Sequence, residues 1–226
     1  MATFLICHGA WSAGWAWKKM RPLLRAAGHE VFTPSYTGLG ERAHLAHPLV
    51  DLETHIQDVM AVIEAEALSD IILVGHSYGG MVATGVADRA GVRIREVVYL
   101  DAFVPADGQS MNDLTGTTPA AIEGWLVPPM PSAPDTAPID LAWTKTRRRH
   151  HPVQCFVQKL QLRNGKRAMR RSYIYCAKKG PGDVFVQFAA RFKVDPAWKY
   201  YEMDASHSPN ITAPDELAAL LMRIVS

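Results

Sequence analysis

The sequence has little cysteine, little net charge and no long apolar run, and each absence excludes a class of protein. Its three cysteines cannot all pair with one another and stand at no Cys-x-x-Cys spacing, so neither a disulfide framework nor a zinc finger is expected. The 24 basic residues nearly balance the 22 acidic residues, which argues against nucleic acid as the main partner. No run approaches the roughly 18 to 20 apolar residues of a membrane span, so no membrane association is expected either.

Two further signals are missing. The first residues, Met1 to Cys7, include neither a basic leader nor a small-residue cleavage site, and this favours a cytoplasmic protein. The paired histidines His44 with His47, and His150 with His151, have no carboxylate or thiol beside them at ligand spacing, so no metal site is expected.

What is present indicates one α/β domain. With 226 residues and 48% hydrophobic residues, the chain can bury a sizeable core. Short apolar runs alternate with helical patterns, which predicts a mostly parallel sheet of about six strands with helices on both faces. The predicted strands are 4–7, 31–33, 71–74, 97–100, 173–176 and 200–203, and the predicted helices are 15–27, 52–67, 78–90, 184–192 and 213–224.

One interval breaks this alternation. From Ala102 to Arg171 no clear strand is found, and the segment includes the proline-rich run from Val127 to Pro138. A structureless loop of that length is unusual inside a compact domain, so an inserted cap with one or two short helices is expected. The core is then residues 1–101 and 172–226, and the cap segment is residues 102–171.

Ser77 is the candidate nucleophile. The stretch from Ile71 to Met81 contains Gly-x-Ser-x-Gly between an apolar strand and a helical pattern, the context in which a serine hydroxyl is raised on a sharp turn. Side chains in place of Gly75 or Gly79 would collide with neighbouring backbone. Without a strand before it and a helix after it, a Gly-x-Ser-x-Gly sequence would indicate only a glycine-rich turn with a chance serine.

A serine at neutral pH needs a base, an orienting acid and an oxyanion hole. His207 is the candidate base, because it alone of nine histidines follows all the predicted strands. The candidate oxyanion donors are the N–H of Tyr78, directly after the nucleophile, and the N–H of Ala10 in the loop after the first strand, where Gly9 allows close approach to a ligand.

These motifs resemble those of the α/β-hydrolase superfamily. The likeness rests on Phe4-Leu-Ile-Cys-His-Gly-Ala-Trp11, on Ile72-Leu-Val-Gly-His-Ser-Tyr-Gly-Gly80 and on the Ser206-His207 loop. It covers about residues 3–110 and 172–222, and is greatest for the group that contains plant methyl esterases, hydroxynitrile lyases and bacterial carboxylesterases. The resemblance implies a six-stranded version of the fold and no cofactor.

One position departs from that resemblance. Where this group places its acid, just after the strand that holds Cys176, the chain has Lys179. Asp101 ends the preceding predicted strand at the same edge of the sheet and keeps the order serine, acid, histidine, so it is the favoured acid. Asp183 and Asp204, in nearby loops, remain alternatives.

The sequence therefore predicts a serine carboxylesterase that acts on a small ester through an acyl-enzyme. Trp11, Tyr78 and Trp125 are expected to line an apolar substrate pocket. The alternatives are a ligand-binding protein with the same fold and weak turnover, or a hydroxynitrile lyase. The lyase is disfavoured because such lyases resemble one another in carrying threonine and lysine where this chain has Gly9 and Ser208. The oligomeric state stays open, a homodimer included.

Charge is uneven along the chain. Between Asp140 and Asp183 there are twelve Lys or Arg residues and no acid. The ordinary interpretation is a solvated outer surface of the cap segment, and the alternative is attraction of an anionic ester.

Overall fold

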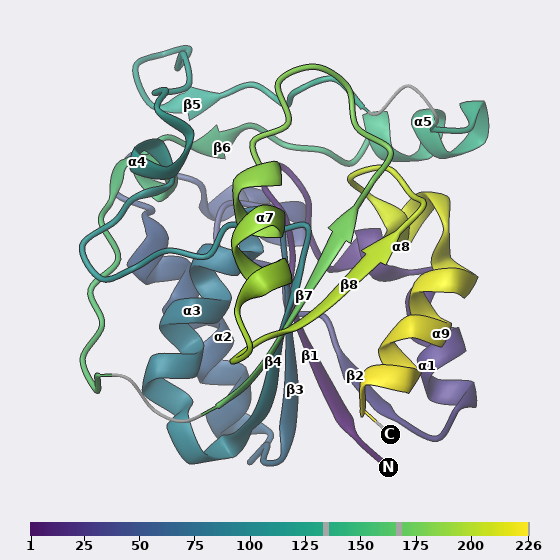
Figure 1. Ribbon diagram of the computed structural model, residues 1–226. Coiled ribbons are helices and arrows are strands. Elements are labelled where there is room, and N and C mark those ends of the chain that lie inside the picture. The colour runs from purple at the N-terminus through teal and green to yellow at the C-terminus, as the bar shows by residue number, and fades with distance from the viewer. Residues whose placement is uncertain (133–135, 166–168, 226) are drawn as a thin grey trace.

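The computed structural model describes residues 1–132, 136–165 and 169–225, and a parallel sheet lies at its centre (Figure 1). Six strands pair in the order β2-β1-β3-β4-β7-β8, each parallel to its neighbours. This confirms the predicted fold class. The strands are β1 (Thr3–Cys7), β2 (Glu30–Phe32), β3 (Ile71–His76), β4 (Ile94–Leu100), β7 (Arg170–Cys176) and β8 (Lys199–Met203).

Helices cover both faces of the sheet, as Figure 1 shows. On one face lie α2 (Leu52–Ala65), α3 (Gly79–Ala90) and α7 (Val186–Val194), and on the other lie α1 (Met20–Ala26) and α9 (Pro214–Val225). Successive side chains of β3 point to opposite faces. Leu73 therefore packs in the apolar cluster under α2 and α3, and Val74 in the cluster under α1 and α9.

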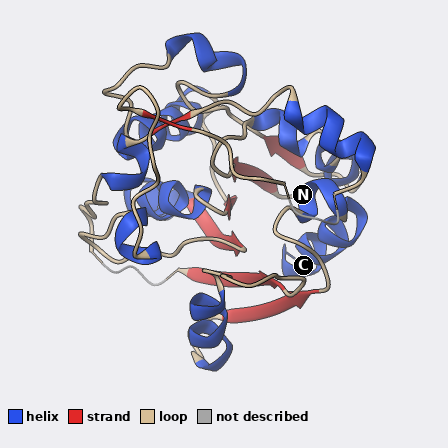
Figure 2. Ribbon diagram, turned by 90° about the horizontal axis from the view of Figure 1, so that it is seen from above, coloured by secondary structure: helices blue, strands red, loops and turns tan. Residues whose placement is uncertain are grey.

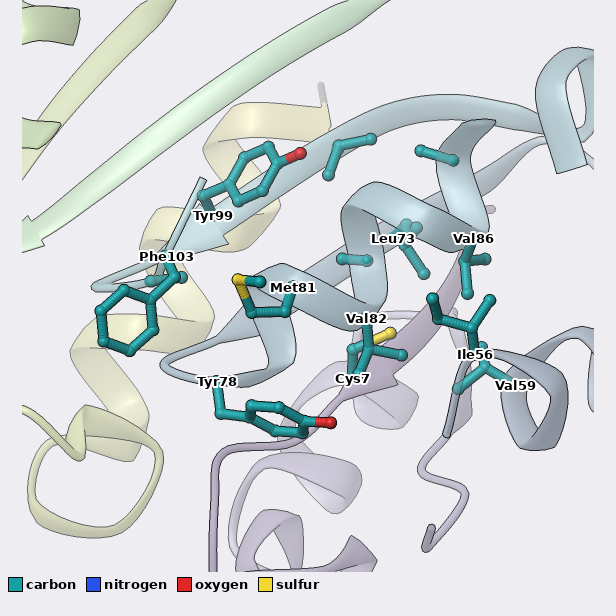
Figure 3. Packing of buried hydrophobic residues seen from close by; sticks show 14 of the residues in the cluster. Cys7, Ile56, Val59, Leu73, Tyr78, Met81, Val82, Val86, Tyr99 and Phe103 are labelled. Atoms are coloured by element: carbon teal, nitrogen blue, oxygen red, sulfur yellow. The ribbon is translucent and has the colours of Figure 1, made fainter. Parts of the chain in front are cut away.

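Buried apolar side chains hold α3 against the sheet and against α2. Met81, Val82 and Val86 on this helix lie close to Leu73 on the sheet and Ile56 on α2 (Figure 3). All of these side chains are buried, so the start of α3 is fixed relative to the strand that precedes it.

The predicted helix over 15–27 is instead two pieces. A 3-10 helix spans Gly14–Trp17, and α1 begins only at Met20. Pro22 accounts for the break, because a proline is tolerated in the first turn of a helix but would remove a hydrogen bond from the interior of a longer one. Two further 3-10 helices span Gly40–Leu45 and Gly91–Arg93.

The helices and short strands of the cap segment lie above the carboxyl ends of the strands (Figure 1), and Figure 2 looks onto them from above. The cap segment contains α4 (Met111–Thr115), β5 (Leu126–Val127), α5 (Pro138–Lys145), β6 (His151–Pro152) and α6 (Gln154–Val157). The structure thus differs from the expected one or two helices without strands, because β5 and β6 are too short to leave a sequence pattern. They form an antiparallel pair.

Part of the cap segment lies outside the described residues, namely 133–135 of the proline-rich run and 166–168, which include the basic residues Lys166 and Arg167. The last short helix of the core, α8 (Pro209–Thr212), follows the loop that carries His207. Within the described ranges, no helix combines the length and the apolar character that crossing a bilayer requires.

Candidate active site

Ser77 lies on a sharp turn between β3 and α3. Its φ is +55°, a left-handed conformation that is strained for any residue with a side chain. The N–H of Ser77 donates to the Leu100 carbonyl at 3.3 Å, and the N–H of Phe103 donates to the Ser77 carbonyl at 3.2 Å. The end of β4 therefore holds the turn in place.

Two glycines let α3 begin this close to the strands. A Cβ at Gly79 would lie 2.0 Å from the carbonyl oxygen of Cys7, and one at Gly80 would lie 2.1 Å from the carbonyl oxygen of Phe103. Both oxygens are backbone atoms, one at the end of β1 and one in the loop just after β4, so neither can move away without shifting the backbone. The glycines after the serine thus allow backbone to approach backbone, as the sequence pattern predicted.

His207 is hydrogen bonded to Asp101. Its Nδ1 lies 2.5 Å from Oδ2 of Asp101, and the carboxylate is fully buried at the end of β4. The other carboxylate oxygen accepts a hydrogen bond from the N–H of Cys176 at 3.3 Å. Because the carboxylate oxygen can only accept, the Nδ1 of His207 carries the proton and Nε2 is left free.

The two alternative acids have other partners. Asp183 accepts a hydrogen bond from the Tyr175 hydroxyl at 2.7 Å. The Asp204 side chain is 86% exposed and pairs with Lys178 at 3.2 Å. Among the described acidic residues, Asp101 is the one that contacts His207.

Lys179, at the position where the sequence resemblance led us to expect an acid, contacts the same carboxylate. Its Nζ donates to Oδ2 of Asp101 and also lies 3.7 Å from Oδ1 of Asp183. Burial raises the pKa of Asp101, but the hydrogen bond from His207 and the charges of His207 and Lys179 outweigh it, so the pKa ends below its usual value. A fully buried Asp101 therefore stays ionised.

Two further contacts hold His207, one to its ring and one to its backbone carbonyl. Phe185 stacks on the ring with ring centroids 4.9 Å apart and planes 15° from parallel. The Nε2–H of His76 donates to the His207 carbonyl at 2.7 Å. The ring remains partly accessible, with 35% of the side chain exposed.

The predicted oxyanion donors are free. Within the described residues, the N–H groups of Ala10 and Tyr78 have no hydrogen-bond acceptor. Gly9 lies against Ser77, since a Cβ there would be 3.2 Å from Cβ of Ser77. Unpaired backbone N–H groups are available to donate to a developing oxyanion.

A cavity of about 690 Å³ opens over these groups. The candidate residues that line it are Gly9, Ala10, Trp11, Ser77, Tyr78 and His207. The cap segment supplies Met111, Val127 and Met130 among other apolar residues. Trp125 is not part of this lining. Trp125 is half-buried directly before β5, and its carbonyl accepts a hydrogen bond from the N–H of Val153, so we no longer count it among the candidate substrate-site residues.

Ser77 and His207 share the cavity without touching. In the described part of the chain the Ser77 hydroxyl has no hydrogen-bond partner, His207 included. Nucleophile-to-base hydrogen bonds are often long without substrate and shorten when it binds. The hydrogen bond between Asp101 and His207, by contrast, is already formed.

A buried cluster beneath the cavity is the one place among the described residues where metal ligands gather. His55, His151 and Cys155 each bring a ligand atom within 4.8 Å of the others. The sequence pairs His151 only with His150, because His55 is distant along the chain and Cys155 is not at a ligand spacing expected from sequence alone.

The hydrogen bonds of this cluster do not suit a metal. The Thr37 carbonyl accepts from Nε2 of His55 at 3.0 Å, so that nitrogen carries a proton. The Trp11 N–H donates to Nδ1 of His151 at 3.1 Å, so the proton of His151 is on Nε2. Burial raises the pKa of the Cys155 thiol, which keeps it protonated. The residues instead connect the cap segment to the loop that holds Ala10.

Buried histidines make the fold sensitive to acid. Burial lowers the pKa of His8, His55 and His76 to about 3. The unfolded chain protonates these rings near pH 6.5 and the folded protein only near pH 3, so the free energy of unfolding falls as the pH drops through this window. At pH 5.5 the three rings together should remove about 4 kcal/mol, from a typical total of about 5 to 15 kcal/mol.

Urea denaturation followed by circular dichroism at pH 7.5, 6.5 and 5.5 measures this loss. A variant of the exposed His44, H44Q, should follow the wild-type pH dependence because its ring stays in water in both states. Equal free energies of unfolding at pH 7.5 and 5.5 would show that the three rings are not buried in their neutral form.

Comparison with known proteins agrees with the fold and the motifs. A carbendazim hydrolyzing esterase from Nocardioides sp. (strain SG-4G) is 39% identical over 238 residues, which cover 98% of each chain. Salicylic acid-binding protein 2 from Nicotiana tabacum is 33% identical over 128 residues, which cover 54% of this chain and 48% of that protein. The solved structure of an extracellular alpha/beta-hydrolase from a Paenibacillus species is 25% identical and superposes with a TM-score of 0.81 over 99% of this chain and 98% of the other.

The model of the alpha/beta hydrolase family matches residues 4–220, which include the Ser77 turn, Asp101 and His207. The resemblance inferred from the motifs is thereby confirmed. The chain belongs to the alpha/beta hydrolase family.

Proposed function

We propose that Ser77, His207 and Asp101 form the catalytic triad of this carboxylesterase-type hydrolase, which cleaves the ester of a small, partly apolar substrate through an acyl-enzyme. The observation that carries the proposal is the 2.5 Å contact between His207 and the buried Asp101, at the wall of the cavity that Ser77 also lines. This hydrogen bond keeps the proton on Nδ1 of His207, so Nε2 is unprotonated and can accept a proton.

In the proposed reaction, the Ser77 hydroxyl attacks the ester carbonyl while Nε2 of His207 takes its proton. The N–H groups of Ala10 and Tyr78 donate to the oxyanion of the tetrahedral intermediate. His207 returns the proton to the leaving alcohol, and the acyl group stays on Ser77. Water, deprotonated by His207, then releases the acid and restores the serine.

The unusual Lys179 is compatible with this reaction because Asp183 offsets its charge. Asp101, Asp183 and Lys179 together keep one net negative charge. A single negative charge is what the imidazolium of His207 needs as it forms. The ion pair with Lys179 also keeps the buried carboxylate ionised before substrate binds.

The largely apolar cavity supports a small ester as the substrate. The relative from Nocardioides is named for carbendazim, a methyl carbamate, so we include methyl carbamates among the acyl bonds proposed. The three cysteines, Cys7, Cys155 and Cys176, are free and buried, which supports the cytoplasm as the proposed location.

A binding protein with little turnover is the second candidate, because the Ser77 hydroxyl is not yet hydrogen bonded to His207 and one relative is named for binding salicylic acid. Stopped-flow release of 4-nitrophenol from 4-nitrophenyl acetate separates the two. An esterase should give a burst equal to the enzyme concentration, followed by steady turnover. Saturable binding without release of 4-nitrophenol would instead establish the binding protein.

A further inference from the structure

Arg148 differs from every other residue that lines the cavity. Among the described lining residues it is the one charged side chain apart from histidine, and no Asp, Glu or Lys accompanies it. A cavity that is otherwise mostly apolar therefore has a fixed positive charge on its wall.

No acidic side chain among residues 1–132, 136–165 and 169–225 neutralises the guanidinium. Its Nη1 donates to the Met130 carbonyl at 2.5 Å, and its carbon lies 5.8 Å from the centre of a Trp11 ring. Within the described part of the chain no carboxylate lies within ion-pair distance of Arg148. The group is half-buried, and this burial lowers its pKa. Partial burial therefore removes water from the charged guanidinium, and no carboxylate among the described residues compensates for the lost solvation.

The two arginines next to Arg148 in the sequence, Arg147 and Arg149, lie in different surroundings. Arg147 is exposed, lies over the Trp143 ring and donates to the Trp143 carbonyl. Arg149 is exposed as well and donates to the carbonyls of Thr146 and Arg148 itself. Arg147 and Arg149 lie on a solvated outer surface, as expected for the basic stretch. Of these three arginines, only Arg148 lines the cavity.

We propose that Arg148 binds a carboxylate on the substrate, so that this esterase prefers esters carrying a second, anionic group. The proposal rests on the proposed function and adds the substrate class. An arginine fork matches a carboxylate in shape, and charge-assisted hydrogen bonds are stronger where water is partly excluded. Trp11 sits beside the guanidinium and directly follows Ala10, a proposed oxyanion donor. The carboxylate and the reacting carbonyl should therefore be separated by a short spacer.

Half-esters of dicarboxylic acids test this proposal. Monomethyl succinate, glutarate and adipate vary the spacer, and each has a neutral counterpart of the same shape in which a carboxamide replaces the carboxylate. For at least one length, wild-type enzyme should give a higher kcat/KM on the half-ester than on its amide. Arg148→Gln should lower kcat/KM for that half-ester about 10- to 100-fold and change the amide by less than about 3-fold.

Two variants control the experiment. Arg149→Gln removes the same charge from the exposed surface and should leave the preference unchanged, which separates a local contact from general attraction. Arg148→Lys keeps the charge without the fork and should restore only part of the preference. Equal losses on the half-ester and the amide, or the same selective loss in Arg149→Gln, would overturn the proposal. So would the absence of any preference at all three lengths.

Binding separates this proposal from the proposed function. Calorimetry of glutarate, succinate and adipate with Ser77→Ala, and with Ser77→Ala combined with Arg148→Gln, needs no turnover. The double variant should bind the best diacid about 10- to 100-fold more weakly. If wild-type enzyme cleaves neither these esters nor 4-nitrophenyl acetate but this difference is found, the esterase assignment fails and the carboxylate site stands. If the esters are cleaved but no difference is found, the carboxylate site fails alone.

Discussion

Replacement of Ser77 by alanine is expected to lower kcat by about 10⁵-fold or more, because loss of a nucleophile removes the acyl-enzyme route altogether. The fold should be unaffected. The Ser77 hydroxyl has no hydrogen-bond partner among the described residues, and alanine meets the same strain at a φ of +55°, so the free energy of unfolding should change by less than about 0.5 kcal/mol.

The measurement is steady-state hydrolysis of 4-nitrophenyl acetate, combined with urea denaturation of the same preparations. Ser69→Ala is the matched control, since Ser69 is exposed just before the amino end of β3, at the edge opposite the cavity. Wild-type rates in Ser77→Ala would remove Ser77 as the nucleophile, whatever the outcome for stability.

Asp101→Asn should be the second severe change, with a loss in kcat of about 10⁴-fold by analogy with triad aspartates. Asparagine can offer its amide N–H to His207, which would favour the imidazole tautomer whose Nε2 carries the proton and cannot act as base. It also leaves the forming imidazolium without its buried counter-charge and beside the cation of Lys179.

The control for this variant is Asp183→Asn, which removes a carboxylate that hydrogen bonds Tyr175 and not His207. Its kcat should fall by about 10-fold, far less than in Asp101→Asn, because Asp101 keeps its contact with His207 while Lys179 loses the charge of Asp183 that offsets it. Lys179→Met should retain most activity, because Asp101 keeps its contact with His207. If Asp183→Asn is the crippling change and Asp101→Asn is mild, the acid has been assigned to the wrong loop. Thermal denaturation of all three variants shows whether a loss comes from unfolding.

Much of this protein could be predicted because the relevant signals are local. The apolar run before Gly75 predicts a strand, and the helical spacing after Gly79 predicts a helix. Only a tight turn can connect the two over so few residues. Figure 3 shows the consequence, with the start of α3 packed against the sheet. Where the local signal was ambiguous, the prediction differed from the structure. The expected helix over 15–27 divides between Trp17 and Met20, with Pro22 in the first turn of α1, and β5 and β6 are too short to show any period.

Positions that depend on distant contacts were harder to predict. Trp125 is aromatic and lies in the cap segment, yet it stays out of the cavity, while Arg148 from the neighbouring basic stretch lines it. Both residues belong to irregular segments whose course depends on packing against the core. The same limit applies to the cluster of His55, His151 and Cys155, whose members come together only through the fold.

The amino-acid sequence by itself determined the fold class and the candidate nucleophile and base, because alternating periodicity and the glycines around Ser77 act over a few residues. Only the tertiary structure decided which of three aspartates contacts His207, and that Lys179 shares that carboxylate. The reason is physical: the ends of β4 and β7 and the loop after β8 are far apart along the chain, and only their common edge of the sheet brings those charges into one buried contact.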